Sequence, residues 1–102
     1  MKLNIEPRHL SIVRKILNEN LKDLNTIVYV FGSRRSGTVK KYSDLDLAID
    51  YAGQKIPFGV YTKLSVAFEN SLLPYKVDIV DLNSVSDQFK KFINNNLAIL
   101  DY

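Results

Sequence analysis

The sequence predicts a small α+β domain with a mixed β-sheet and helices mainly on one face of that sheet. Apolar residues recur every three or four positions in three segments, and apolar and polar residues alternate in two others. A continuous run of β-branched and aromatic residues, TIVYVF, is typical of a further strand. In chain order the expected elements are helix, strand, strand, helix, strand and helix. Because 102 residues allow one ordinary hydrophobic core, we expect residues 1–102 to form a single domain.

Three segments have the apolar spacing of amphipathic helices. The first spans about residues 7–22, the second runs from Pro57 to just before Pro74, and the third follows Ser84 and ends near Asn95. Proline fits the first turn of a helix, and a serine three residues before an acidic residue is a variant of the capping box. The residues expected on the apolar faces are Leu10, Val13, Ile16, Leu17, Leu21 and Leu24, then Tyr61, Leu64, Phe68 and Leu72, then Val85, Phe89, Phe92, Ile93 and Leu97.

Three other segments are expected to form strands. Residues 26–31 carry no charged side chain, which favours a strand that is covered on both faces and ends at Gly32. Residues 44–50 and residues 76–82 alternate between apolar and acidic side chains, so each should pack one face against the core. For residues 97–102 the pattern leaves open a short closing strand or an ordered tail.

Two aspartates at the start of the second strand suggest a chemical site. Residues two apart in a strand point to the same face, with Cα atoms about 6.6 to 6.8 Å apart, so Asp44 and Asp46 should lie side by side. Their like charges repel, and such a pair usually has a raised pKa or binds a cation. If the second and third strands are neighbours, Asp78 joins them. Such a trio can hold two Mg²⁺ ions, one for the attacking oxygen and one for a nucleotide triphosphate.

The turn after the first strand has the residues of a phosphate site. Gly32 lets the backbone approach a ligand, and Ser33 is expected to start a helical turn whose N–H groups and hydroxyl bind phosphate. Of Arg34 and Arg35, we expect at most one to touch phosphate. Ser43 either braces the aspartates or turns the chain into the strand.

Composition excludes several other kinds of site. The chain has no cysteine and a single histidine, so a metal must bind to oxygen ligands. The N-terminus lacks the apolar stretch of a signal peptide and no apolar run is long enough to span a membrane, which predicts a cytoplasmic protein. The net charge of +3 suits phosphate-bearing or acidic partners, but we do not expect nucleic acid as a direct partner. Asp50 and Asp81 are expected to solvate the strand ends or to accept turn hydrogen bonds rather than bind metal.

These motifs together resemble a known family. GSRRSG, then SDLDLAID, then the aspartate in KVDIV resemble the nucleotidyltransferase pattern of the DNA polymerase beta superfamily. That pattern is a glycine-serine turn, a spacer, two acids flanking one residue, and a third carboxylate on a later strand. The small size and the ending INNNLAILDY are similar to the minimal nucleotidyltransferase (MNT) branch. The resemblance covers about residues 27–102 and implies a nucleotidyltransferase fold.

The resemblance also implies roles for individual residues. Gly32 and Ser33 would hold the nucleotide triphosphate, with Arg34 and Ser43 as further nucleotide-binding candidates. The remaining roles concern the metal: Asp44 and Asp46 would ligate Mg²⁺, and Asp78 would bind the catalytic metal or act as base for the incoming hydroxyl.

The branch suggests a biological setting as well. MNT proteins are typically found beside a helical HEPN-domain protein, often a ribonuclease toxin, and some neutralise it by transferring AMP from ATP to a tyrosine. The resemblance therefore implies a Mg²⁺-dependent antitoxin that transfers a nucleoside monophosphate to a hydroxyl on its partner. Since 102 residues leave no room for an acceptor domain, we expect the partner to supply the acceptor site, in a homo- or hetero-oligomer. The alternatives are an antitoxin that inhibits by binding alone, and transfer to a small molecule or RNA.

Overall fold

The computed structural model describes residues 3–32, 34, 43–94 and 97–102. The predicted order of elements is confirmed, with one short strand added at the C-terminal end. The elements are α1 (Pro7–Leu21), β1 (Ile27–Phe31), β2 (Leu45–Asp50), α3 (Phe58–Glu69), β3 (Val77–Asp81), α4 (Asp87–Asn94) and β4 (Ala98–Ile99). None of the helices among these described residues is both long enough and apolar enough to cross a membrane.

The four strands form one mixed sheet in the order β3-β2-β1-β4. β2 and β3 are parallel, whereas β1 is antiparallel to both β2 and β4. β4 decides between the two alternatives left open for residues 97–102, because Ala98 pairs with Val30. The tail beyond it is also ordered: Leu100 N–H donates to the carbonyl of Val28 at 2.8 Å, and the hydroxyl of Tyr102 lies in hydrogen-bond contact with Thr26.

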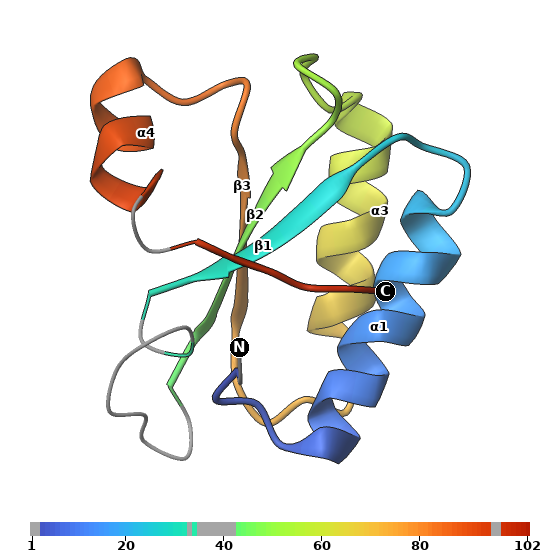
Figure 1. Cartoon of the computed structure of the whole chain (residues 1–102). Coiled ribbons are helices and arrows are strands. Elements are labelled where there is room, and N and C mark those ends of the chain that lie inside the picture. Colours follow the sequence, from blue (N-terminus) through green and yellow to red (C-terminus); the bar gives the residue numbers. More distant parts are fainter. Residues whose placement is uncertain (1–2, 33, 35–42, 95–96) are drawn as a thin grey trace.

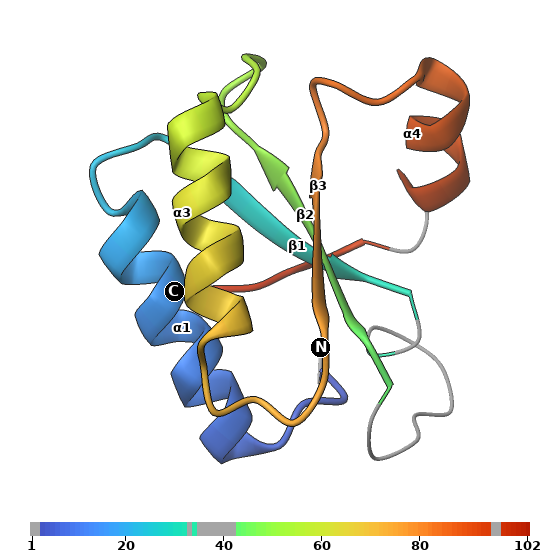
Figure 2. The ribbon, with the colours of Figure 1, turned by 180° about the vertical axis from the view of Figure 1, so that it is seen from behind.

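Helices α1 and α3 lie side by side on one face of the sheet, as predicted, and α4 lies on the other side near the end of β3 (Figures 1 and 2). The core fills the space between the sheet and these two helices. Apolar burial of this kind is the main driving force for folding. The residues that are at most 1% exposed there are Val13, Leu17, Leu21, Val28, Val30, Leu45, Leu47, Ile49 and Leu64.

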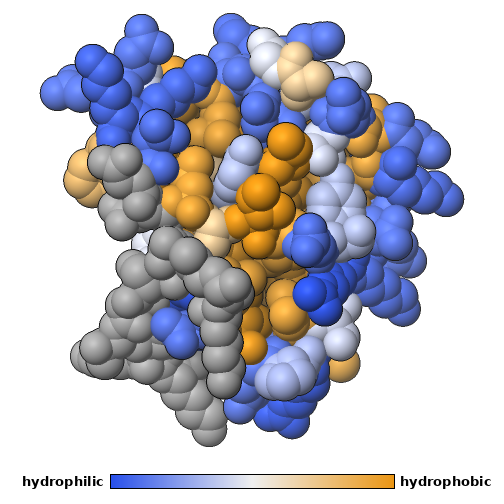
Figure 3. Space-filling view, viewed as in Figure 1, coloured by the Kyte–Doolittle hydropathy of each residue, from blue (hydrophilic) through white to orange (hydrophobic). Residues whose placement is uncertain are grey.

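The second face of the sheet is less covered than the sequence suggests. In β1, Val28 and Val30 are buried, but Tyr29 and Phe31 are only partly buried and Ile27 is 44% exposed. The prediction that this strand is covered on both faces is therefore wrong, because α4 covers only one end of the second face. Apolar surface is visible where β4 and the tail cross the molecule (Figure 3).

Three residues that were assigned to apolar helix faces are exposed instead, and the first of them is Tyr61, which is 38% exposed in the first turn of α3. Leu72 is 90% exposed because α3 ends at Glu69, and helical spacing has no meaning beyond that point. Phe92 is 78% exposed because α4 buries little more than Ile93. The end of α4 at Asn94 agrees with the prediction.

The N-terminal cap of α4 also differs from the prediction. Ser86 rather than Ser84 caps the helix, since its Oγ accepts a hydrogen bond from Phe89 N–H at 3.1 Å. The hydroxyl of Ser84 donates to Asp81 Oδ2 at 2.9 Å. The cap lies two residues later than predicted because the hydroxyl of Ser84 is bonded to Asp81, the last residue of β3.

Asp50 and Asp81 accept turn hydrogen bonds, as predicted. Asp81 Oδ2 accepts from Ile56 N–H at 2.8 Å and its Oδ1 accepts from Asn83 N–H at 3.0 Å. Asp50 Oδ1 accepts from Gly53 N–H at 3.0 Å and from Asn83 Nδ2 at 2.9 Å. These two carboxylates hold the turns at the C-terminal ends of β2 and β3.

The hydrogen bonds at Asp50 predict a pH-dependent contribution to stability. The Asn83 side chain, then Gly53 N–H, lower the pKa of Asp50 below its ordinary value of 3.8. A lowered pKa in the folded state means that the contribution is present above about pH 4 and is lost as the pH falls through the folded value. D50N places an amide, which resembles the protonated acid, at this position. At pH 7 this substitution should lower the free energy of unfolding, by no more than about 1 kcal/mol. Thermal unfolding between pH 2.5 and 7 should show this difference vanish in acid, and a constant difference would contradict the assignment.

Candidate active site

Asp46 and Asp78 lie next to each other on neighbouring strands. β2 and β3 are parallel with Asp46 paired to Asp78. Leu45, Leu47 and Ile49 are fully buried against the helices, so the period of two directs Asp46 to the opposite face. Asp44 is exposed and immediately precedes β2. The neighbouring strands that the sequence argument required are therefore present, with the two aspartates in the same register position.

The electrostatics of this corner centre on Asp46. Burial raises the pKa of its carboxyl, and the charges of Asp78 and Asp44 raise it further. The ionised side chain is thus unfavourable where it stands, and a cation bound beside it would relieve both the desolvation and the repulsion. Lys76 Nζ lies 3.4 Å from Asp78 Oδ1, but both side chains are substantially exposed, so this ion pair contributes little.

The three carboxylates have the chemistry of a Mg²⁺ site, because they are hard oxygen donors with excess negative charge. Within the described part of the chain, no group of three acidic or histidine side chains is arranged closely enough to hold an ion in its present conformation. The backbone positions are nevertheless close, since Asp46 and Asp78 are paired and Asp44 is two residues from Asp46. Side-chain rotation would therefore be needed to bring the carboxylate oxygens around one ion.

Gly32 lies directly against Asp46. It follows β1, whose last residue, Phe31, pairs with Asp46 in the antiparallel register. Gly32 has a φ of +74°, and a Cβ atom at this position would collide with Asp46 Oδ2. Glycine therefore suits the left-handed backbone here, and its missing Cβ leaves room for the Asp46 carboxylate in its present position. This places the predicted phosphate turn and the predicted metal ligand in contact.

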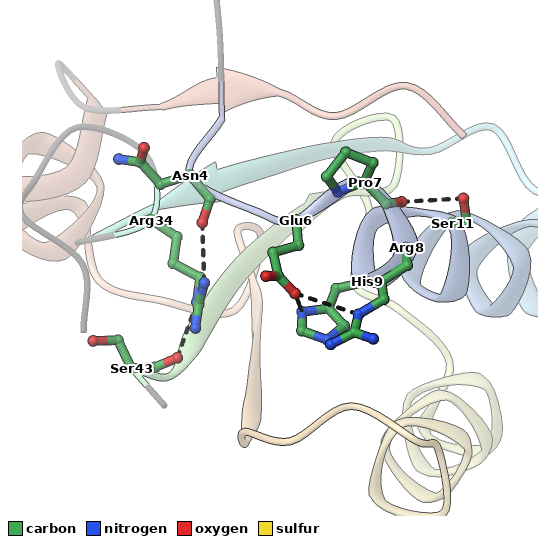
Figure 4. A network of polar contacts seen from close by, with 8 residues as sticks. All are labelled: Asn4, Glu6, Pro7, Arg8, His9, Ser11, Arg34 and Ser43. Carbon is green, nitrogen blue, oxygen red and sulfur yellow. Dashed lines mark hydrogen bonds and ion pairs between the residues drawn. The ribbon is translucent and has the colours of Figure 1, made fainter. Parts of the chain in front are cut away.

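Arg34 lies in a different environment from the one expected of a phosphate ligand. Arg34 is only 4% exposed, and among the described residues it is the one charged residue that is buried. Its Nε donates to the carbonyl of Ser43 at 2.9 Å and its Nη1 donates to the carbonyl of Asn4 at 3.0 Å (Figure 4). Ser43 therefore contributes its backbone oxygen here. Ser33 and Arg35, with the rest of residues 35–42, lie outside the described residues.

Sequence reasoning missed the residues that surround Arg34. Its guanidinium carbon lies 3.8 Å from the centre of the Tyr75 ring. His9 packs edge to face against the same ring, with 5.5 Å between the ring centres, and its side chain is 12% exposed. No signal in the sequence indicated Asn4, because its contact is made by the main chain.

A hollow of about 610 Å³ lies next to Asp78, between α3 and the outer edge of β3. β3 is the edge strand, so this side of it has no neighbouring strand. The wall combines aromatic and apolar side chains with a few polar ones. Its lining includes Tyr61, Ser65, Phe68, Tyr75, Lys76 and Asp78.

Comparison with known proteins identifies the family. Residues 12–101 match the family described as polymerase beta, nucleotidyltransferase. The chain belongs to this family. The match spans every strand and the whole candidate site, so the nucleotidyltransferase fold predicted from the motifs is confirmed.

Relatives of this nucleotidyltransferase include toxin–antitoxin proteins. It is 38% identical over 98 residues to the probable protein adenylyltransferase MntA of Haemophilus influenzae, covering 96% of this chain and 83% of that protein. A crystal structure of a toxin–antitoxin with AMP-PNP matches with a TM-score of 0.71 and 28% identity, over 90% of this chain and 72% of the other. A complex of tri-AMPylated Shewanella oneidensis HEPN toxin with MNT antitoxin matches with a TM-score of 0.57 and 26% identity, over 90% and 68%. The resemblance to the MNT branch is thus confirmed.

Proposed function

We propose that this nucleotidyltransferase transfers AMP from ATP to a hydroxyl group of a HEPN partner and thereby acts as its antitoxin, in the cytoplasm. The observation that carries the proposal is the corner where Asp46, Asp78 and the Gly32 turn meet. The names of the relatives, a protein adenylyltransferase and an MNT antitoxin bound to an AMPylated HEPN toxin, support this choice of donor and acceptor.

Asp44, Asp46 and Asp78 would hold two Mg²⁺ ions, which when bound neutralise charge on the phosphates and acidify the acceptor hydroxyl. The backbone at Gly32 and Ser33 would cradle the triphosphate beside them, with Ser43 at the start of β2 as a further nucleotide-binding candidate. Holding donor and acceptor in line accounts for much of the catalysis in reactions of this type.

The transfer itself is a single displacement at the α-phosphorus. The acceptor oxygen forms a bond to this phosphorus while the bond to the bridging oxygen breaks and pyrophosphate leaves. Asp78 would take the proton of the acceptor hydroxyl or hold the catalytic ion. Because Asp78 also lines the hollow beside β3, we propose that the acceptor side chain of the partner approaches from that side.

The proposal is tested with purified protein, ATP, Mg²⁺ and the protein encoded by the neighbouring gene, which the proposal expects to be of the HEPN type. Intact-mass spectrometry should show the partner gaining one or more AMP groups, with release of pyrophosphate. Reactions without Mg²⁺, and with GTP, CTP or UTP in place of ATP, provide the controls for metal and nucleotide. If no nucleotide produces an adduct on the partner, the enzymatic proposal is wrong.

A further inference from the structure

We propose that Arg34 is a positioning residue: its buried guanidinium ties together the chain segments that carry Gly32, Asp44 and Asp78, and it does not bind the nucleotide. The consequence for catalysis rests on the proposed function, whereas the tie itself is a property of the fold.

The first connection joins the two ends of the loop between β1 and β2. Arg34 follows Gly32 by two residues, and its Nε donates to the carbonyl of Ser43, the residue before Asp44. This side chain therefore adds a second link between the glycine turn and the start of the aspartate pair, beyond the pairing of Phe31 with Asp46. This bond is independent of the strand ladder, which begins only at Leu45.

The second connection anchors this junction to the N-terminal segment, residues 3–6. Arg34 Nη1 donates to the carbonyl of Asn4 at 3.0 Å, and Asn4 N–H donates back to the carbonyl of Arg34 at 2.9 Å. Figure 4 shows the guanidinium between the backbones of Asn4 and Ser43. The two reciprocal bonds fix both the side chain and the main chain of Arg34.

The third connection reaches β3. The face of the Tyr75 ring lies 3.8 Å from the guanidinium carbon, which is within the range of a cation–π contact. Tyr75 precedes Lys76, whose carbonyl accepts Leu45 N–H at 2.9 Å where β2 and β3 begin to pair. The contact with Arg34 is made by the ring of Tyr75. The buried hydroxyl of Tyr75 has no hydrogen-bond partner among the described residues.

Arginine is suited to this task and ill suited here to binding ATP. Its planar fork points donors in fixed directions and also stacks on aromatic rings, so one group can meet two carbonyls and a ring. A buried charge is tolerated when it is hydrogen-bonded in this way. With only 4% of the residue exposed, little of its surface is available to a triphosphate.

The kinetic test compares R34M and R34K with wild type. A displacement of about 1 Å in catalytic groups can lower a rate about 100-fold, so R34M should lose about that factor in kcat for AMP transfer. The KM for ATP should change less than about threefold, because no direct contact is removed. The kcat of R34K should lie between those of R34M and wild type, since the lysine ammonium replaces at most part of the donors of the guanidinium group. The matched control is R14M, because Arg14 Nε also donates to a backbone carbonyl, that of Asp101, at 2.9 Å on the exposed side of α1.

A second readout does not depend on activity. Hydrogen exchange of Asn4 and Leu45 amides should accelerate more than about tenfold in R34K and R34M, while Leu82, at the far end of β2 and β3, should exchange as in wild type. Should R34M fail to fold by thermal melting, R34K supplies both readouts. A tenfold rise in the KM for ATP at unchanged kcat, or unchanged exchange at Asn4 and Leu45, would overturn the proposal. If wild type transfers no AMP, the proposed function fails but the exchange result still decides this inference.

Discussion

Replacing Asp46 by asparagine should reduce AMP transfer on the order of 1,000-fold, which is the size expected when a group that stabilises the charge of the transition state is removed. The substitution keeps the shape of the side chain but removes the charge that a cation would bind. Burial, Asp78 and Asp44 raise the pKa of the Asp46 carboxyl, so its ionised form opposes folding at neutral pH when no cation is bound. In EDTA at pH 7, D46N should therefore melt no lower than wild type, and lost activity will not reflect unfolding.

The matched control is D50N, which makes the same change on the same face of β2, four residues away. Asp50 bonds to the turn at the opposite end of the strand, so its transfer activity should stay within about twofold of wild type. Equal activity of D46N and wild type would exclude Asp46 from the site. A D46N protein that transfers no AMP but still neutralises its partner would favour inhibition by binding alone.

Replacing Gly32 by alanine should both destabilise the protein and lower AMP transfer about 100-fold. The left-handed backbone, with φ at +74°, costs about 1 to 2 kcal/mol for a residue with a side chain. The added Cβ also collides with Asp46 Oδ2, so the carboxylate is displaced within the space in which it must turn toward Asp78 and a bound ion. Such a displacement is enough to account for the loss in rate. Chemical denaturation and the AMP transfer assay measure the two effects.

G53A separates backbone strain from the collision. Gly53 has a nearly identical φ of +79°, but a Cβ there would meet nothing within 4 Å, and the residue lies in the turn after β2, away from the site. G53A should therefore show the loss of stability without the loss of activity. If G32A and G53A behave alike in both assays, the contact between Gly32 and Asp46 has no role in the reaction.

Much of the fold was predictable because it depends on local periodicity. The alternation of Leu45, Leu47 and Ile49 with acidic residues determined which face of β2 is polar, and the structure agrees. Periodicity failed where coverage depends on distant elements. The run at residues 26–31 reads as fully apolar whether or not a helix covers its second face, and α4 covers only part of that face. Phe92 is exposed for the same reason.

The same distinction between local pattern and long-range packing applies to the candidate site. By itself, the sequence determined the site's chemistry: carboxylates at 44, 46 and 78, and a glycine before a basic loop. Only the tertiary structure decided that β3 pairs with β2 in the register that sets Asp78 beside Asp46, and that Arg34 is buried. Strand neighbours and register are set by long-range packing. The partners of Arg34 are backbone carbonyls, which every residue carries, so no pattern of side chains could indicate Asn4 or Ser43.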